Sequence, residues 1–409
     1  MIKTNCDIIC FSLSRWDAPI SSPSLALAKE LAKTNRVFFI DHPFSWKDYI
    51  LGKHSPQVMF RKQGMLKGNS IYYHPPAFPE KLITVCPPVI YPINFLPGGK
   101  VYNAVSQVNE NRMVKLLRRV IRENSIRQYI FINFFDPFFL RKIPEDIKPL
   151  RMVYQSMDDI SQVAYSRRHG VALEKEIIRN ADVTLCTSLE LTRIHSAWSP
   201  NVYYHPNAAD TTLFQSALKN VLPKPPDMLG IEGRIIGFTG SIEYRTDFEL
   251  LRKTALYHHD KTLVLVGPVS GIEHLKAGLD KLPNVIFAGA KNIEELPAYL
   301  QYFDCAIIPY KINKLTKSIY PLKINEYLSA GKPVVATHFS EDIYAFRDVA
   351  QVVKDDNAFC RAIDKAIFED DEAKRMLRRN TAEQHTWKKR VEQFWEIIKR
   401  EPLKTANSK

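Results

Sequence analysis

Short apolar runs of strand length alternate with stretches of helical spacing, and this alternation limits the possible folds more than any other feature. Between the runs lie amphipathic stretches such as SLALAKELAKT and ALEKEIIRNA. Continuous apolar strands followed by helices are typical of parallel sheets covered on both faces. In the first half the runs occupy residues 7–13, 36–41, 129–135, 151–157 and 182–188. This half is therefore predicted to be a doubly wound α/β domain.

The alternation stops at a stretch rich in proline and glycine, 219–233, and then restarts. The later runs occupy residues 234–241, 262–267, 284–289, 305–310, 334–337 and 350–354. A chain of 409 residues is also too long for one ordinary core,. We therefore expect two Rossmann-like domains facing across a cleft, where ligands bind beyond the carboxyl ends of the strands. The expected parts are a first domain 1–215, a linker 216–233, a second domain 234–385, and a C-terminal helix and tail 386–409 that pack back.

Composition excludes several classes of protein. The six cysteines form no CxxC pair and no zinc-ligand spacing, which predicts reduced thiols and no structural metal,. The chain has no apolar run long enough to span a bilayer and no signal-peptide pattern at its start, so a cytoplasmic location is expected,. The net charge of +13 is concentrated in residues 1–215, which hold 27 Lys and Arg against 18 Asp and Glu. Such an excess attracts anionic partners without selecting among them.

The block SIYPLKINEYLSAGKPVVAT, 318–337, combines several structural signals. Pro321 suits the first turn of a helix, and Gly331 suits the left-handed turn that ends one. The block thus predicts a helix at about 320–330, followed by a strand. Lys323 and Glu326 are three residues apart on one helix face, near an N-terminus that favours an anion. The simpler alternative for this pair is a solvated salt bridge.

A glycine pair precedes this block in the same predicted domain. Gly237 and Gly240 end the strand that opens the second half, and Arg245 follows them. This order lets backbone approach a pyrophosphate with a cation beside it, although a plain tight turn would use the same glycines.

In combination these segments resemble the GT-B glycosyltransferases, in particular the retaining family four (glycosyl transferases group 1). The resemblance rests on IIGFTGS, NVIFAGAKNIEELPAYLQYFDCAIIPY and YPLKINEYLSAGKPVVAT in this order and at compatible spacing. It is strong over 231–340, moderate over 151–215 and weak before 150.

The resemblance implies a role for each matching residue. Glu326 would bind the ribose hydroxyls of a nucleotide, and Arg245 would neutralise phosphate. The diphosphate would lie against the backbone near Gly240 and against the amides from Tyr320 to Lys323, a stretch that includes Pro321 and Leu322. Ser318 stands where the family often has a second glutamate, which leaves the contact to the donor sugar open. The implied activity is a hexosyl transfer that needs neither metal nor other cofactor, because amides, Arg245 and Lys323 stabilise the leaving phosphates.

The first half is expected to bind the acceptor and complete the site. Asp158 and Asp159 follow a predicted strand and would orient sugar or acceptor hydroxyls, unless they only cap a helix or form a loop,. The loop 14–24 follows the first strand and would face the donor phosphates and the acceptor. A plain loop, capped by Ser21, Ser22 or Ser24, explains it equally well.

Two segments bear on the acceptor and on location. Residues 111–128 predict a helix with basic and apolar sides, as on anionic lipid or as in an ordinary packed surface helix. Basic residues on this helix are Arg112, Lys115, Arg119 and Arg122. Residues 78–99 are apolar and broken by proline, which argues against a central strand and favours an acceptor groove or a membrane contact,.

We therefore expect a glycosyltransferase of cell-surface polysaccharide synthesis that uses a UDP- or GDP-sugar donor and a glycan or lipid-linked acceptor. It would lie in the cytoplasm, peripherally on the inner face of the plasma membrane, and would not bind nucleic acid. The alternatives are a nucleotide-sugar 2-epimerase and a non-catalytic protein that binds nucleotide sugars.

Overall fold

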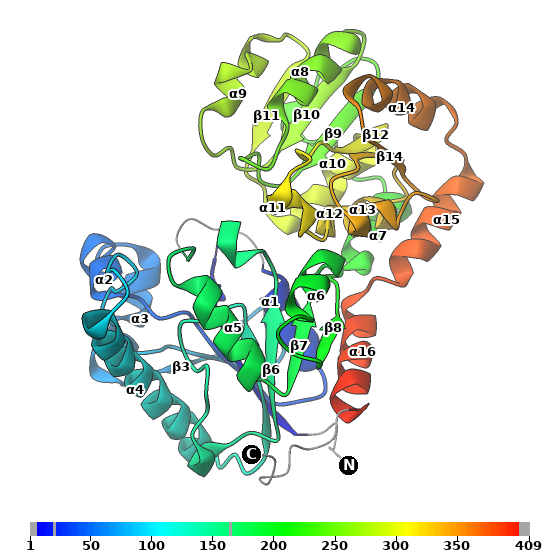
Figure 1. The fold of residues 1–409 in the computed structure, drawn as a ribbon. Helices are drawn as coiled ribbons and strands as arrows, with labels where there is room; N and C mark the ends of the chain where they lie inside the picture. Colours follow the sequence, from blue (N-terminus) through cyan, green and yellow to red (C-terminus); the bar gives the residue numbers. More distant parts are fainter. Residues whose placement is uncertain (1–5, 19–21, 163–165, 401–409) are drawn as a thin grey trace. The chain divides into compact units, whose positions relative to one another are not determined.

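The computed structural model describes residues 6–18, 22–162 and 166–400, and the chain divides into two compact units (Figure 1). The first unit comprises residues 1–205 and 390–409, and the second comprises 206–389. Each unit is built on a largely parallel sheet, so the predicted doubly wound α/β class is confirmed. Among the helices of the described ranges, none is both long and apolar enough to cross a membrane.

The first unit contains an eight-stranded sheet in the order β3-β4-β2-β1-β5-β6-β7-β8. Its strands are β1 (Asp7–Ser12), β2 (Val37–Ile40), β3 (Tyr72–Tyr73), β4 (Leu82–Val85), β5 (Tyr129–Phe134), β6 (Arg151–Ser156), β7 (Val183–Cys186) and β8 (Val202–Tyr204). All neighbours are parallel except β3 and β4. The chain leaves β1 toward β2 and later returns to β5 on the other side of β1. The order of strands therefore reverses between β1 and β5.

Helices lie along this sheet. They are α1 (Pro23–Leu31), α2 (Trp46–Leu51), α3 (Pro56–Lys67), α4 (Lys100–Glu123), α5 (Gly170–Asn180) and α6 (Leu189–His195). All of them except α2 bury side chains, as the helical spacing predicts. The 3₁₀ turns are η1 (Glu145–Ile147) and η2 (Ile160–Gln162). The core between helices and sheet includes Phe11, Phe38, Leu117 and Phe131, all fully buried.

The expectation that 78–99 contains no central strand is wrong for Leu82–Val85. This segment forms β4, which lies between β3 and β2 in the sheet. The prolines of the region stand outside these four residues, at Pro79 and from Pro87 onward. Every N–H of the strand therefore remains available, and proline blocks pairing only at its own position.

The second unit contains a six-stranded sheet in the order β11-β10-β9-β12-β13-β14. Its strands are β9 (Ile235–Thr239), β10 (Thr262–Val266), β11 (Val285–Gly289), β12 (Cys305–Ile308), β13 (Val334–Thr337) and β14 (Gln351–Val353). All neighbours in this sheet are parallel. Here the order of strands reverses between β9 and β12, the point at which open sheets usually bind ligands.

The helices of the second unit include the one predicted at about 320–330. They are α7 (Thr211–Lys219), α8 (Phe248–Tyr257), α9 (Glu273–Lys276), α10 (Leu296–Tyr302), α11 (Lys314–Lys317), α12 (Leu322–Ser329), α13 (Glu341–Tyr344), α14 (Asp356–Phe368) and α15 (Glu372–Glu383). This unit also contains three 3₁₀ turns: η3 (Pro226–Met228), η4 (Leu279–Lys281) and η5 (Ile293–Glu295). Gly331 ends α12 in the left-handed region with φ +66°, as its position predicts,.

The segment 216–233, which the composition marks as a linker, packs within the second unit. Met228 is fully buried in its core, and the side-chain amide of Gln301 binds the backbone of Asn220 and Leu222. The last helix, α16 (Trp387–Arg400), packs back as predicted. Gln393 Nε2 donates to Tyr204 O at 3.1 Å within the first unit.

Candidate functional site

The second unit brings the expected donor residues to the point where the strand order of its sheet reverses. Gly240 directly follows β9 with φ +120°, a value that favours glycine, and its N–H donates to Val266 O at 2.7 Å,. A Cβ at Gly240 would lie 2.1 Å from Cε of Lys323. The missing side chain therefore lets Lys323 lie across the end of β9. Gly237 has a different explanation, because a Cβ there would strike the Phe303 ring at 2.0 Å.

Lys323 lies in the first turn of α12 and offers two kinds of donor. Its Nζ donates to the Tyr310 hydroxyl at 3.2 Å. Its backbone N–H has no acceptor within the described ranges, as expected at a helix start,. Two of the neighbouring positions expected to bind diphosphate are not available: Pro321 has no N–H, and the N–H of Leu322 is donated to Tyr320 O at 3.0 Å. Lys323 is thus the clearest anion donor of this turn.

Glu326 lies one turn further along α12 and is only 7% exposed. Burial raises the pKa of this carboxyl to about 7, and the nearby Lys323 ammonium opposes the rise. Its oxygens accept no hydrogen bond from any residue that the structure describes. A buried carboxylate without donors is destabilising unless another molecule supplies them. The environment therefore fits a residue that receives hydrogen bonds from a ligand.

Ser318 and Tyr320, both expected at the donor site, have side chains engaged within the second unit. The Ser318 hydroxyl donates to Leu315 O at 2.8 Å at the end of α11. The Tyr320 hydroxyl accepts from Asn325 Nδ2 at 3.0 Å and lies 3.3 Å from His385 Nδ1. These hydrogen bonds fix the loop that leads into α12.

Arg245 lies in the loop after β9, and Glu243 holds its guanidinium: Nε donates to Glu243 Oε1 at 2.6 Å. The same loop is joined to the loop after β12, because Lys311 N donates to Arg245 O at 2.9 Å. The two loops that flank the reversal in strand order are thus fixed to each other.

Asp158 and Asp159 follow β6 in the first unit, as predicted. Asp159 Oδ1 accepts hydrogen bonds from Ser161 N at 3.0 Å and from Ser161 Oγ at 2.6 Å, so it caps the turn η2. The sequence allowed either such a cap or a contact to substrate hydroxyls. One carboxylate can serve in both roles. The loop occupies the carboxyl end of a central strand, where substrate groups bind in such sheets.

A buried polar cluster supports this end of β6. The Ser156 hydroxyl donates to Glu174 Oε1 at 3.1 Å and lies 2.9 Å from His195 Nε2. Burial raises the pKa of Glu174 to about 8 and lowers the pKa of His195 to about 4. At neutral pH both side chains are therefore uncharged, as their burial requires.

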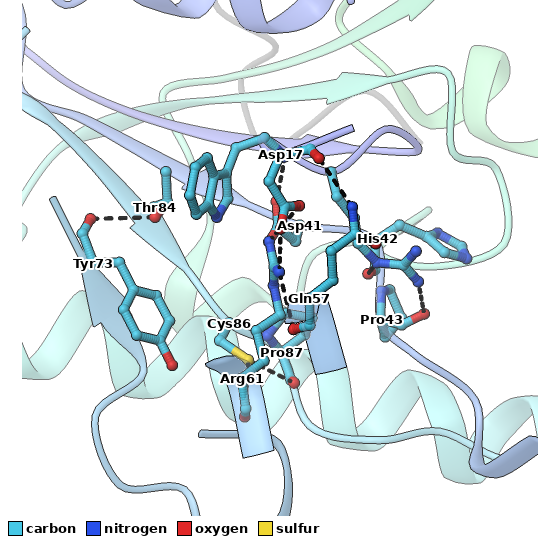
Figure 2. Close-up of polar contacts among 12 residues, drawn as sticks. Asp17, Asp41, His42, Pro43, Gln57, Arg61, Tyr73, Thr84, Cys86 and Pro87 are labelled. Atoms are coloured by element: carbon cyan, nitrogen blue, oxygen red, sulfur yellow. Dashed lines mark hydrogen bonds and ion pairs between the residues drawn. The ribbon is translucent and has the colours of Figure 1, made fainter. Parts of the chain in front are cut away.

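The loop after β1 is fixed by a cluster of buried charges that the sequence did not reveal (Figure 2). Arg61 on α3 forms ion pairs with Asp17 at 2.7 Å and with Asp41 at 2.8 Å. Asp41 also accepts from Trp16 N at 3.0 Å. Burial raises the pKa of Asp41 to about 6, and the Arg61 charge opposes the rise.

The cap of α1 is one of the three serines considered for this role. Ser22 accepts a hydrogen bond from Leu25 N at 3.2 Å, while Ser21 lies outside the described residues. Asp17 lies shortly after a predicted strand and Asp41 is the last residue of one, which is the signal in the sequence that could have drawn attention to them.

Comparisons with known proteins agree with these features. Residues 233–368 match the family model of the glycosyl transferases group 1. A Bacillus subtilis (strain 168) glycosyltransferase, TuaH, assigned by its name to teichuronic acid biosynthesis, is 33% identical over 233 residues. This match covers 54% of the chain and 58% of TuaH, so the chain spans little more than half the length of this relative.

Solved structures extend the likeness over nearly the whole chain. A sucrose-phosphate synthase from Thermosynechococcus elongatus has a TM-score of 0.67 at 16% identity, covering 97% of this chain and 99% of its own. A UDP-forming α,α-trehalose-phosphate synthase from Burkholderia xenovorans, in complex with glucose-6-phosphate, has a TM-score of 0.69 at 11% identity, covering 97% and 100%. At sequence identities this low, the structural similarity shows only that this chain shares their fold. The expected GT-B fold and the resemblance to the group 1 glycosyltransferases are confirmed.

Proposed function

We propose that this chain, which resembles the group 1 glycosyltransferases, transfers a hexose from a nucleotide-diphosphate sugar to a glycan or lipid-linked acceptor, with retention of configuration. The observation that carries the proposal is Glu326, a buried carboxylate beside Lys323 that receives no hydrogen bond from the described part of the chain. A vicinal diol such as that of ribose supplies two donors to one carboxylate. The name of TuaH, a similar protein, supports a role in cell-surface polysaccharide synthesis.

Each residue of the donor site has a part in this reaction. Glu326 binds the ribose, while the Lys323 N–H and the charges of Lys323 and Arg245 hold the diphosphate, which packs against Gly240 where no side chain stands in its way. The bond between the anomeric carbon and the phosphate oxygen breaks, and the acceptor oxygen bonds to that carbon. The leaving phosphate takes the proton of the acceptor hydroxyl. Negative charge develops on the diphosphate, where fixed donors lower the barrier most.

In the first unit, Asp158 and Asp159 orient the hydroxyls of sugar or acceptor. Uridine and guanosine nucleotides are both included in the proposal. The trehalose-phosphate synthases with this fold are UDP-forming by their names, which favours UDP.

The proposal includes a peripheral position on an anionic membrane surface. A cavity of about 500 Å³ between α3 and α4 has apolar walls, among them Met65 and Leu116, and a basic rim. On this rim Arg112 donates to Val89 O at 2.6 Å and Arg119 to Gly68 O at 2.7 Å, so both support the fold. Lys115 is exposed and has no ion pair within the described ranges, which leaves it available to lipid phosphate,.

Co-sedimentation with vesicles tests this position. The chain should bind phosphatidylglycerol vesicles more strongly than phosphatidylcholine vesicles, and Lys115→Glu should weaken the binding. Equal binding to both lipids would contradict the proposal.

The activity is tested with a panel of UDP-, GDP- and dTDP-sugars. Slow hydrolysis or transfer supports a transferase, conversion to an epimer would indicate the epimerase, and binding without turnover would indicate a non-catalytic protein.

Glu326→Ala should weaken donor binding about tenfold or more, which is the loss expected when a charged hydrogen-bond partner is removed. The matched control is Glu341→Ala, which removes a carboxylate that is 70% exposed in the same unit. Unchanged donor affinity in Glu326→Ala would overturn the assignment.

A further inference from the structure

A histidine and an aspartate meet in the first unit at the point where the order of its strands reverses. His42 follows β2 and Asp136 follows β5, the two strands that flank β1. Nδ1 of His42 lies 2.6 Å from Asp136 Oδ2. The pair therefore spans the carboxyl end of β1, the place where open sheets bind ligands. The function proposed above assigns it no role.

The structure fixes Asp136 firmly. The Asn133 side chain holds the backbone of Asp136 through two hydrogen bonds. Asp136 N donates to Asn133 Oδ1 at 2.9 Å, and Asn133 Nδ2 donates to Asp136 O at 2.8 Å. Asp136 Oδ1 accepts from Phe138 N at 3.0 Å. On either side stand bulky residues in the left-handed region, Phe135 with φ +57° and Leu140 with φ +52°. Such conformations are costly and are found mainly at functional sites.

The pairing determines which nitrogen of His42 is free. A carboxylate has only lone pairs, so Nδ1 carries the hydrogen, and in the neutral imidazole Nε2 is then the acceptor. Arg15 holds the backbone of the same residue by donating to His42 O at 3.0 Å. Within the described ranges, Nε2 of His42 makes no hydrogen bond, and it is not among the buried atoms that lack a partner. An oriented acceptor is thus accessible to a ligand.

His42 borders a cavity of about 300 Å³ in the first unit. Its apolar wall consists of Ile90, Tyr91, Phe95, Phe138 and Phe139. Lys47 and Asn94 also line it, and their side chains have no hydrogen bonds to other described residues. Asp48 lines the same cavity, where its carboxylate forms a capping box with Ser45. The cavity therefore combines aromatic rings with a few donors and acceptors of mixed charge.

We propose that this cavity binds a sugar ring of the acceptor, with Nε2 of His42 accepting a hydrogen bond from one of its hydroxyls. This inference rests on the proposed function and locates the binding site for its acceptor. The apolar C–H face of a sugar packs on aromatic rings, and its hydroxyls both donate and accept. A phosphate is anionic near neutral pH and would be repelled by the Asp48 carboxylate.

The test is saturation-transfer NMR on the full chain with the methyl glycosides of glucose, N-acetylglucosamine and glucuronic acid. At least one glycoside should show saturable binding. Phe95→Ala should weaken it about tenfold, because it removes an aromatic surface that is 67% exposed and not needed for packing,. The matched control is Phe368→Ala, which removes a ring that is 76% exposed in the second unit and should leave binding unchanged.

A second variant tests the dyad. His42→Phe keeps a ring at this position but removes the acceptor, so glycoside binding should be lost while the circular dichroism spectrum stays that of the wild type. If the variant unfolds, Phe95→Ala alone decides. Absence of glycoside binding to the wild type, or full binding to Phe95→Ala, would overturn the inference. Displacement of the glycoside by inorganic phosphate would also overturn it, because the cavity would then be an anion site.

Titration of the same samples with UDP and GDP separates this inference from the function on which it rests. Nucleotide binding with no glycoside binding would overturn the inference and leave the donor assignment intact. Absence of nucleotide binding would overturn the proposed function instead. Phe95→Ala should bind nucleotide as the wild type does.

Discussion

Single residues of the proposed donor site have surroundings that leave polar groups without partners or require a glycine. Glu326 is buried and receives no hydrogen bond from any described residue, and Lys323 lies over a glycine that could carry no side chain there. These are costs to the folded chain, and a bound nucleotide diphosphate would offset them.

Gly240→Ala should weaken the binding of UDP more than a glycine-to-alanine change at another left-handed position does. The new Cβ would lie 2.1 Å from Cε of Lys323, at a φ of +120° that alanine rarely adopts. We expect a loss of about 1–3 kcal/mol in the free energy of unfolding and weaker binding of UDP. Gly278→Ala is the control, because Gly278 has φ +68° but nothing within 4 Å of its Cβ position. Equal UDP affinity of the two variants, measured by calorimetry, would contradict the role of Gly240.

Binding of UDP should depend on the ionisation of Glu326. Its pKa of about 7 lies above its ordinary value, so the carboxyl is largely protonated below neutral pH. The ionised form accepts both ribose hydroxyls, and affinity should therefore rise with pH through about 7 and level off above it. Glu326→Gln should lose this dependence, although UDP itself titrates in both proteins. Identical pH profiles for wild type and variant would count against the assignment.

Sequence reasoning found residues that belong to recognisable short motifs and missed pairs that belong to none. Gly240, Lys323 and Glu326 belong to short motifs, and their placement on one sheet edge follows from the strand order. His42 and Asp136 are 94 residues apart, and Arg61 is 20 residues from Asp41. Such pairs depend on which strands are neighbours, which local spacing does not reveal.

Elements of secondary structure were predicted well where the hydrophobic pattern was continuous. The apolar runs match the strands of both sheets to within a few residues, and Gly331 marks the end of α12. The short strands β3 and β8 have two and three residues, too few for a clear pattern, and prolines concealed β4. For the basic side of α4 the sequence allowed either a contact with anionic lipid or an ordinary surface helix, and Arg112 and Arg119 on it bind backbone carbonyls.

The contact between α3 and the loop after β1 should depend on Arg61. Arg61→Leu leaves Asp17 and the buried Asp41 without their cation, so we expect a loss of about 3–5 kcal/mol in the free energy of unfolding. The control is Arg118→Leu, which breaks an exposed ion pair with Asp146 and should change the free energy of unfolding far less,. Urea unfolding measures both. A similar small loss for both variants would show that the cluster does not fix this loop.

The whole molecule consists of two units, each with a parallel sheet whose strand order reverses once. The proposed donor residues gather at the reversal in the second unit, and the His42–Asp136 pair lies at the reversal in the first. The alternation of strands and helices predicted both sheets. The alternation could not predict which strands are neighbours in each sheet. The candidate acceptor cavity depends on that order of strands.

A crystal structure of the full chain with bound UDP tests the central claim most directly. We expect both ribose hydroxyls within hydrogen-bond distance of the Glu326 carboxylate, and the diphosphate against the Lys323 N–H and the backbone of Gly240. A nucleotide bound elsewhere, or a ribose that does not touch Glu326, would contradict the account.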